Sequence, residues 1–291
     1  MTFYRKLLIV PIYSASLIGV SVLPCFGQGG RSLPQVEAFR PITSRIYSSG
    51  EPVGVAQFQQ IAAHGIEVVI SVDGKVPDQK AAAKAGLKYL HLPIGYDGVP
   101  PSVQAALRQV LTEESAPILI HCHHGKHRAP AAAAVAAMLD VNLPNDQALQ
   151  LLKEAGTGTE YKGLWRDVRE FDAGKLKAQP APLLSEAKVD ALVREMSHLG
   201  ESFETLEKLV TSGHAKSKAS ELIVQIQESY RESVRLTANG DYSKDLQKKL
   251  SQAADKVQEL KQTSLQDSGL IKEALAQIKQ DCKSCHTVHR N

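Results

Sequence analysis

The sequence predicts two folded domains of different class, an α/β domain with a parallel sheet followed by an all-α domain of four helices. Two patterns along the 291 residues predict this division. Between Ile46 and Phe171, short apolar runs alternate with amphipathic stretches, which is typical of a parallel sheet covered by helices on both faces. After residue 182, apolar residues recur only every three or four positions, which predicts helices alone. A chain of this length can bury a core in each domain.

The first domain is expected to occupy residues 28–172. Three short apolar runs predict strands, and they lie at residues 66–72, 89–92 and 117–121. Amphipathic stretches between and after these runs predict helices, which lie at residues 55–63, 78–85, 101–111, 129–139, 145–155 and 161–171. Strands that alternate with helices in this way predict a parallel sheet covered on both faces.

Residues 173–182 predict a linker, because they are small, basic and proline residues without an apolar period. Four amphipathic helices are predicted after it, around residues 189–206, 222–234, 246–260 and 270–278. Each apolar stripe needs a partner to bury it, and no strand signal is present. The sequence therefore predicts a four-helix bundle in residues 183–291.

The first residues are typical of a secretory signal peptide. Two basic residues, Arg5 and Lys6, precede a mostly apolar run that extends to Leu23. We expect residues 1–27 to be removed and the protein to be periplasmic or secreted. A transmembrane anchor is the alternative, but a proline and three serines interrupt the run. A lipoprotein signal at Cys25 is a weaker alternative, because the proline before it stands where a small residue is needed.

The overall composition argues against two classes of partner. The net charge is only +3 and the basic residues form no long stripe, so nucleic acid is not an expected partner. No stretch after residue 30 is apolar for long enough to span a bilayer, so no membrane span is expected once the signal is removed. The cysteines do not form the even set of a disulfide-rich exported protein, because Cys122 stands alone.

The last residues contain the motif Cys282-Lys-Ser-Cys285-His286, which is the pattern for covalent attachment of haem c. Two cysteines form thioether bonds to the haem, and the histidine directly after the second is placed to bind the iron. A redox dithiol or half of a zinc site are the alternatives. A dithiol motif of the thioredoxin type belongs after a strand, and the second half of a zinc site is missing here.

Residues 183–291 resemble the cytochrome c-prime family, which are four-helix bundles with CxxCH near the end of the last helix. Arg290, four positions after His286, and the segment Met196-Ser-His-Leu-Gly200 match further positions of that family. The resemblance implies haem c as cofactor, His286 as the proximal iron ligand and Met196 as the candidate distal ligand. An ordinary core role is the alternative for Met196, and His198 is a weaker rival as ligand.

The resemblance also implies what such a module does. A haem with both axial positions filled transfers electrons, whereas an open position binds small gases. A homodimer through the helical bundle is among the expected assemblies, and the redox partner is not indicated by the sequence.

The segment after the third predicted strand has the spacing of a phosphate-binding loop. Cys122 directly follows the strand, five residues separate it from Arg128, and a helix is predicted to begin after the arginine. A curled loop of this kind aims backbone N–H groups at a phosphate, the guanidinium binds two of its oxygens, and the helix dipole adds positive potential. The same field stabilises a thiolate nucleophile at Cys122. Gly125 permits the tight curl.

The region from Ile46 to Phe171 resembles the dual-specificity and protein-tyrosine phosphatase superfamily. The resemblance rests on His121-Cys122 to Arg128, on Ser48-Ser-Gly-Glu-Pro52 and on the strand at 68–72. It implies Cys122 as nucleophile, Arg128 as the phosphate-binding arginine and Asp97 as general acid, with Asp73 as the rival acid. The phosphate-binding residues it implies are His123, His124, Gly125, Lys126, His127 and Arg128.

One position departs from the pattern of that superfamily. A serine or threonine usually follows the arginine and eases breakdown of the phosphocysteine, whereas this sequence has Ala129. A loop that binds anions without catalysis is therefore an alternative. A transition-metal site made by Cys122 and the surrounding histidines is a third interpretation, disfavoured because a phosphate loop points its side chains outward. The outward side chains instead predict a basic rim that suits a phosphorylated, polyanionic substrate.

Taken together, these motifs predict an exported, cysteine-dependent phosphatase that hydrolyses phosphomonoesters through a phosphocysteine. It would be fused to a c-type haem module for electron transfer or redox sensing. The alternative is an inactive anion-binding domain on an electron-transfer or gas-binding cytochrome.

Overall fold

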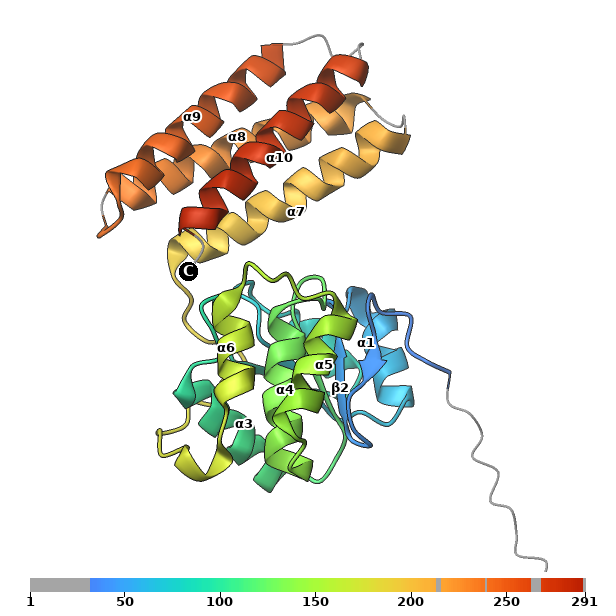
Figure 1. Ribbon diagram of the computed structural model, residues 1–291. Helices are drawn as coiled ribbons and strands as arrows, with labels where there is room; N and C mark the ends of the chain where they lie inside the picture. Colours follow the sequence, from blue (N-terminus) through green and yellow to red (C-terminus); the bar gives the residue numbers. More distant parts are fainter. Residues whose placement is uncertain (1–31, 213–215, 239, 263–267, 290–291) are drawn as a thin grey trace, which may run out of the picture. The chain divides into compact units, whose positions relative to one another are not determined.

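The structure is a computed structural model that describes residues 32–212, 216–238, 240–262 and 268–289. The predicted signal peptide at residues 1–27 and the family position Arg290 lie outside these residues. In the described residues, an α/β domain comes first and helices follow in the C-terminal half, as the sequence predicts (Figure 1). Within the described ranges, no helix combines the length and apolar character needed to cross a membrane.

A mixed sheet of five strands forms the centre of the first domain, in the order β1-β2-β5-β3-β4. The four strands β2, β5, β3 and β4 are parallel, which confirms the predicted parallel pairing, whereas β1 pairs antiparallel with β2. The prediction of a wholly parallel sheet is therefore wrong at the edge formed by β1. The strands are β1 (Arg40–Pro41), β2 (Ile46–Ser49), β3 (Val68–Ser71), β4 (Lys88–His91) and β5 (Ile118–His121).

The sequence pattern missed β1 and β2 for two physical reasons. Strand β1 has only two residues, which is too short to show any period. Strand β2 buries the two serines Ser48 and Ser49, so its inward positions do not give an apolar run. Tyr47 pairs with Leu119 of β5, and this pairing places β2 beside the strand that precedes Cys122.

Six helices of the first domain cover both faces of the sheet. Alternate residues of each central strand point to opposite faces, so Ile118 and Ile120 lie in one apolar core and Leu119 in the other. Helices α3, α4, α5 and α6 contribute to the first core, and α1 and α2 to the second. Their bounds are α1 Gly54–Ala63, α2 Gln79–Lys84, α3 Pro101–Glu113, α4 Arg128–Val141, α5 Asn145–Ala155 and α6 Lys162–Glu170.

Helix α4 is buried along most of its length. Every residue from Arg128 to Met138 is buried, and seven of these eleven are alanines. Small side chains let a helix approach a sheet closely, so α4 packs directly on β2 and β5 (Figure 1). Its first residue, Arg128, is thereby held at a fixed position next to the end of β5.

The stretch predicted to be a linker makes several contacts with the first domain. Ala173–Lys175 forms a short 3-10 helix, and the side chain of Arg108 donates a hydrogen bond to the carbonyl of Leu176. The N–H of Ala181 donates to the carbonyl of Ser102 on α3 at 2.9 Å. These contacts hold the stretch against the first domain from Ala173 to Ala181.

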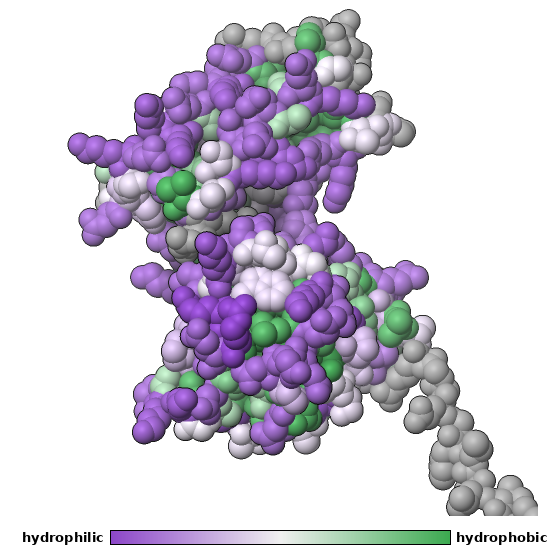
Figure 2. Space-filling model, viewed as in Figure 1, coloured by the Kyte–Doolittle hydropathy of each residue, from purple (hydrophilic) through white to green (hydrophobic). Residues whose placement is uncertain are grey.

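The C-terminal half consists of the four long helices α7 (Ala191–Ser212), α8 (Lys216–Ala238), α9 (Lys244–Gln262) and α10 (Ser268–His289). Their apolar stripes meet in one core that includes Phe203, Ile226, Val257 and Ile278. The helical prediction for this half is therefore confirmed. Figure 2 shows a mostly hydrophilic surface over these helices on the visible face, as expected when the apolar side of each helix is buried.

Candidate functional site

The carboxyl ends of the parallel strands meet at one edge of the sheet. Ser49, Ser71 and His91 end β2, β3 and β4, and the register aligns them with His121 at the end of β5. Loops that follow strands at this edge are where α/β proteins build their sites. The loops that begin there contain the predicted residues Cys122 and Asp97, and α4 begins with Arg128.

The loop from Cys122 to His127 is tightly curled against the segment after β2. Gly125 has φ of +64°, and a Cβ at this position would overlap with backbone atoms of Ser49 and Gly50. The N–H of Glu51 donates to the carbonyl of His123 at 2.9 Å. Glycine is therefore required at position 125 for both the backbone conformation and the close approach.

Arg128 is the buried cation at this edge. Its side chain is 9 % exposed, and one terminal nitrogen donates to Oδ2 of Asp73 at 2.5 Å. The guanidinium carbon lies 4.7 Å from the ring centre of Tyr96. Burial acts to lower the pKa of Arg128, but the Asp73 carboxylate outweighs it and the pKa is raised. Its Nε atom is buried and, among the described residues, has no hydrogen-bond acceptor. A bound anion or water could accept this hydrogen bond.

Asp73 supports this arrangement from the end of β3. Its Oδ2 also accepts a hydrogen bond from the N–H of His123 at 2.8 Å, and its Oδ1 accepts one from the N–H of Lys75 at 3.0 Å. Burial opposes ionisation, but Arg128 and these N–H donors lower the pKa of Asp73 below its usual value. Asp73 is thus an ionised group that orients Arg128. It also accepts the hydrogen bond that the N–H of His123 donates.

Cys122 and His121 are both buried at the end of β5. Cys122 is 3 % exposed and contributes to the core under α4. The imidazole Nε2 of His121 lies 2.5 Å from the hydroxyl of Tyr89 on β4. Burial lowers the pKa of His121 to about 4, so the ring is neutral near neutral pH. His121 thus turns toward β4 and not toward the other histidines of the loop.

Asp97 lies on the exposed side of the loop between β4 and α3, at residues 92–100. The preceding residue, Tyr96, covers the guanidinium of Arg128, so the structure brings the loop of Asp97 to this arginine. The ring of Tyr96 also contacts that of Tyr161 in a tilted arrangement, with 4.5 Å between the ring centres. The Tyr161 ring in turn contacts the ring of His127, also tilted, at 4.6 Å. Three aromatic side chains therefore link the two loops.

The predicted basic rim, which comprises His123, His124, Lys126 and His127, is only partly exposed. Lys126 is exposed, whereas His127 accepts a hydrogen bond from the N–H of Gly158 at 3.2 Å. The carbonyl of Lys126 accepts from the hydroxyl of Thr157 at 2.7 Å. The connection between α5 and α6 thus holds the second half of the loop.

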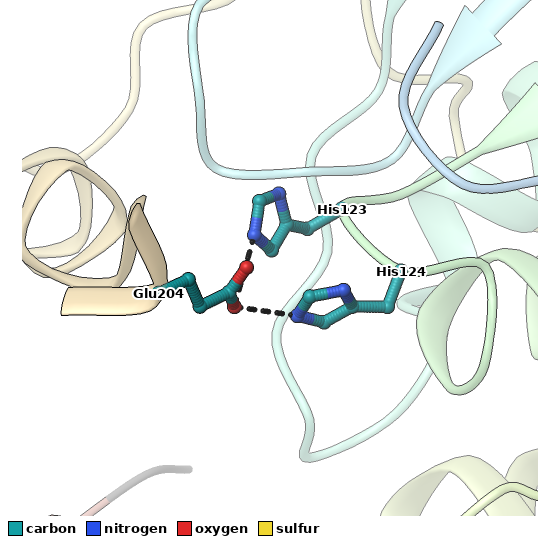
Figure 3. A group of neighbouring side chains, drawn as sticks. All are labelled: His123, His124 and Glu204. Carbon is teal, nitrogen blue, oxygen red and sulfur yellow. Dashed lines mark ion pairs between the residues drawn. The ribbon is translucent and has the colours of Figure 1, made fainter. Parts of the chain in front are cut away.

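His123 and His124 contact carboxylates (Figure 3). Nε2 of His124 lies 2.8 Å from Oε1 of Glu204 on α7, and Nε2 of His123 lies 3.4 Å from the same oxygen. Glu204 and Glu51 raise the pKa of His123 to about 10. Lys75 pairs with Glu51 at 3.1 Å and with Glu201. His123, His124 and Glu204 also place three possible metal ligands within reach of one another.

The residues of the haem motif lie on α10 and the candidate distal ligand on α7. Cys282, Cys285 and His286 are all half-buried. Cys282 and Met196 pack against the same apolar core. The hydroxyl of Tyr230 on α8 lies 3.3 Å from Sγ of Cys282, and burial raises the pKa of both Tyr230 and Cys285.

Sequence reasoning missed the residues that support the loop. These supporting contacts all join segments far apart in the sequence. They are the ion pair of Asp73 with Arg128, the hydrogen bond of Tyr89 with His121 and the ring contact of Tyr96 with Tyr161. The one available signal was Asp73 directly after an apolar run, which indicates a polar residue at a strand end.

Comparisons with known proteins complete the description of the site. No protein-family model matches the chain, and no curated protein matches it. Among solved structures, P. aeruginosa TpbA is similar over 50 % of this chain and 96 % of its own, with 24 % identity and a TM-score of 0.42. The core catalytic domain of the PP-IP phosphatase SIW14 from S. cerevisiae, in complex with citrate, is similar over 50 % and 92 %, with 19 % identity and a TM-score of 0.43. Human DUSP28 is similar over 48 % and 97 %, with 16 % identity and a TM-score of 0.36.

Proposed function

We propose that the first domain is a cysteine-dependent phosphatase that hydrolyses phosphomonoesters through a phosphocysteine. The observation that supports this most directly is the buried Nε of Arg128, which has no acceptor among the described residues. It belongs to the first residue of α4, and the loop that leads to it begins at Cys122. A phosphate bound in this loop would satisfy Nε and gain the potential of the helix N-terminus.

The proposed reaction has two steps. The thiolate sulfur of Cys122 attacks phosphorus, the bond from phosphorus to the leaving oxygen breaks, and the carboxyl group of Asp97 gives that oxygen its proton. Water then attacks the phosphocysteine and gives a proton to the Asp97 carboxylate, which releases phosphate and restores the thiolate. Asp73 does not suit the acid role, because it is held ionised by Arg128 and backbone donors.

The substrate is proposed to carry several negative charges. Lys126 is exposed beside the loop, and His123 stays protonated near neutral pH because Glu204 and Glu51 raise its pKa to about 10. A polyanionic substrate would compete with these carboxylates for the two histidines. The affinity for such substrates should therefore fall steeply with salt.

The test of the phosphatase proposal uses reduced protein and an aryl phosphate. The expected result is measurable hydrolysis that Cys122→Ser abolishes, together with vanadate binding that Arg128→Ala weakens. Arg169→Ala, which removes an exposed arginine of α6, is the matched control and should change neither. Vanadate binding without hydrolysis would favour the second candidate, an anion-binding domain, for which Ala129 is the supporting observation. Folded protein that does neither would contradict both.

We further propose that the helical half is a four-helix bundle that carries haem c. Cys282, Cys285 and His286 stand at positions i, i+3 and i+4 of α10, so they share one side of the helix. Their half-burial and the thiol, thiol and imidazole chemistry fit covalent haem, with His286 as proximal ligand and Met196 as distal ligand. When bound, the haem would supply electron transfer, or gas binding if the distal side is open. Export, proposed from residues 1–27, would bring the chain to the compartment where haem c is attached.

The test of the haem proposal is extraction with acidic acetone after expression with haem-attachment machinery. The expected result is colour that stays with the protein, and its loss in the Cys282→Ala, Cys285→Ala double variant. Colour that extracts into the solvent from the wild type would contradict covalent attachment.

A further inference from the structure

We propose that helix α6 fixes the loop of Asp97 for proton transfer, and that Asp167 and Gly163 are positioning residues for this acid. The inference rests on the proposed phosphatase function. It concerns residues 92–100, which carry Asp97, and the first two turns of α6. Neither Gly163 nor Asp167 belongs to the loop from Cys122 to Arg128.

Helix α6 holds the backbone of this loop directly after Asp97, on both sides of Gly98. Oδ2 of Asp167 accepts a hydrogen bond from the N–H of Val99 at 2.8 Å. One terminal nitrogen of Arg166 donates to the carbonyl of Asp97 at 2.9 Å. Nε of Arg166 donates to Oδ1 of Asp167 at 2.7 Å, which orients both side chains. The two peptide groups that flank Gly98 are therefore both bonded to one helix.

Two glycines permit this approach. A Cβ at Gly163 would overlap with the carbonyl group of Asp97, which is backbone and cannot rotate away. A Cβ at Gly98 would overlap with the carboxylate of Asp167, and Gly98 also has φ of +147°. At Gly163 the helix backbone thus lies directly against the backbone of Asp97, and at Gly98 the loop backbone lies against the Asp167 carboxylate. Displacement of the helix or the loop displaces the main chain of Asp97.

Asp167 contributes more to this contact than Arg166 does. The side chain of Asp167 is 17 % exposed, whereas that of Arg166 is 54 % exposed. A charged acceptor that is largely shielded from water holds a backbone N–H more strongly than an exposed guanidinium holds a carbonyl. Asp167 is therefore the residue whose removal should release the loop.

The same helix is linked to the phosphate-binding arginine. Tyr161 directly precedes α6, and its ring contacts that of Tyr96, the residue before Asp97, in a tilted arrangement. Tyr96 in turn lies over the guanidinium of Arg128. One helix thus sets the position of the acid relative to the anion site, which is what transfer of a proton to the leaving oxygen requires.

The experiment compares Asp167→Ala, Asp167→Asn and the matched control Glu170→Ala, an exposed carboxylate of the same helix. The substrates are para-nitrophenyl phosphate, whose leaving group needs little protonation, and phenyl phosphate, whose leaving group depends on it. For Asp167→Ala we expect kcat to fall about tenfold for phenyl phosphate and less than about twofold for para-nitrophenyl phosphate. In Asp167→Asn the amide oxygen still accepts from Val99, so most of the loss should be recovered. The control should match the wild type.

A second arm removes the acid itself. In an Asp97→Asn background, Asp167→Ala should cause no further loss with phenyl phosphate, because both act on one proton transfer. The fluorescence of Trp165, the chain's single tryptophan, checks that α6 remains folded. Gly163→Ala should give the same substrate dependence as Asp167→Ala, or unfold.

The outcomes separate the inference from the proposed function. Equal loss on both substrates, or a loss that adds to that of Asp97→Asn, would overturn the positioning role. A selective effect of Asp97→Asn with none of Asp167→Ala would overturn only this inference. A folded, reduced wild type without activity on either substrate would overturn the proposed function and the inference with it.

Discussion

The two halves of the chain build their candidate sites in different ways. In the α/β domain, Cys122 and Arg128 frame a single loop, but Asp73 and Tyr96 contact Arg128 from distant parts of the sequence, and α6 holds the loop of Asp97. In the helical half, the proposed haem-binding residues Cys282, Cys285 and His286 all lie within five positions of α10. A site built from loops depends on its supporting contacts, whereas a site built on one helix depends on spacing alone.

This difference predicts where substitutions act. In the first domain, residues outside the motif should change both stability and activity, because they carry buried charge. In the second half, residues outside the motif should change the coordination of the iron with little effect on attachment. Four predictions test this contrast.

The largest effect is expected at the buried ion pair of Asp73 and Arg128. Asp73→Ala leaves the Arg128 guanidinium buried without its carboxylate, so the free energy of unfolding should fall by about 3–5 kcal/mol. Urea unfolding followed by the fluorescence of Trp165 measures this loss. Glu114→Ala, which breaks the more exposed pair with Lys88, is the control and should cost about 1 kcal/mol or less. Equal losses in the two variants would mean that Arg128 is not a buried cation.

A smaller effect is expected from the neutral, buried His121. Its pKa is about 4 in the folded protein, and about 6.5 in an unfolded chain. Between these values the unfolded state binds more protons, so the stability of the first domain falls as the pH falls from 6.5 toward 4. The loss from His121 between pH 7 and pH 5 should be about 2 kcal/mol.

The measurement is urea unfolding at both pH values in the wild type and in His121→Gln. In this variant, the free energy of unfolding should differ less between pH 7 and pH 5 than it does in the wild type. The control His198→Gln, at an exposed position of α7, should keep the difference seen in the wild type. An unchanged difference in His121→Gln would contradict a neutral His121.

The third prediction separates the two interpretations of Met196 in the helical half. Met196→Leu keeps an apolar side chain of similar size, so the stability of the haem-loaded protein should change by less than about 1.5 kcal/mol. It removes the thioether, so the methionine–iron band should disappear and carbon monoxide should bind faster. Covalent attachment through Cys282 and Cys285 should be unaffected. A wild type that already binds carbon monoxide as fast as the variant would make Met196 a core residue only.

The smallest effect is expected at Ala129, which is fully buried beside Arg128. Ala129→Ser supplies the hydroxyl that the phosphatase superfamily usually has, and should speed breakdown of the phosphocysteine by about tenfold at most. Rapid-mixing kinetics should show a burst of aryl alcohol in the wild type and a smaller burst in the variant. Ala131→Ser, two positions along the same buried helix, is the control and should leave the burst unchanged. A wild type without a burst would mean that breakdown does not limit turnover.

The parts of the fold that the sequence predicted are those with strong periods. The run that became β5 was identified because it is apolar on both faces, and the stripes that became α7 to α10 because one face of each helix is continuously apolar. Strand β2 was missed because Ser48 and Ser49 are buried polar residues. Strand β1 is defined only by its pairing with β2.

For the candidate site, the sequence indicated the residues of the loop motif but not the contacts that hold them in place. Cys122 and Arg128 were found because their spacing is local. Other contacts depend on strand order and helix packing. They are the hydrogen bond from the N–H of His123 to Asp73 and the hydrogen bond from the N–H of Val99, in the loop of Asp97, to Asp167. Such contacts between distant segments leave no pattern in a single sequence.

The alanine-rich packing of α4 has a consequence for how the binding of an anion would affect the rest of the domain. Between Ala129 and Ala137 there are almost no side-chain rotamers to readjust, so a change at Arg128 cannot be absorbed locally. Anion binding at the N-terminus of α4 should instead slow amide hydrogen exchange along the whole helix and in the adjacent strand β5. The helix would respond as one rigid unit, so amide exchange near its C-terminal end at Val141 should depend on whether an anion occupies the loop.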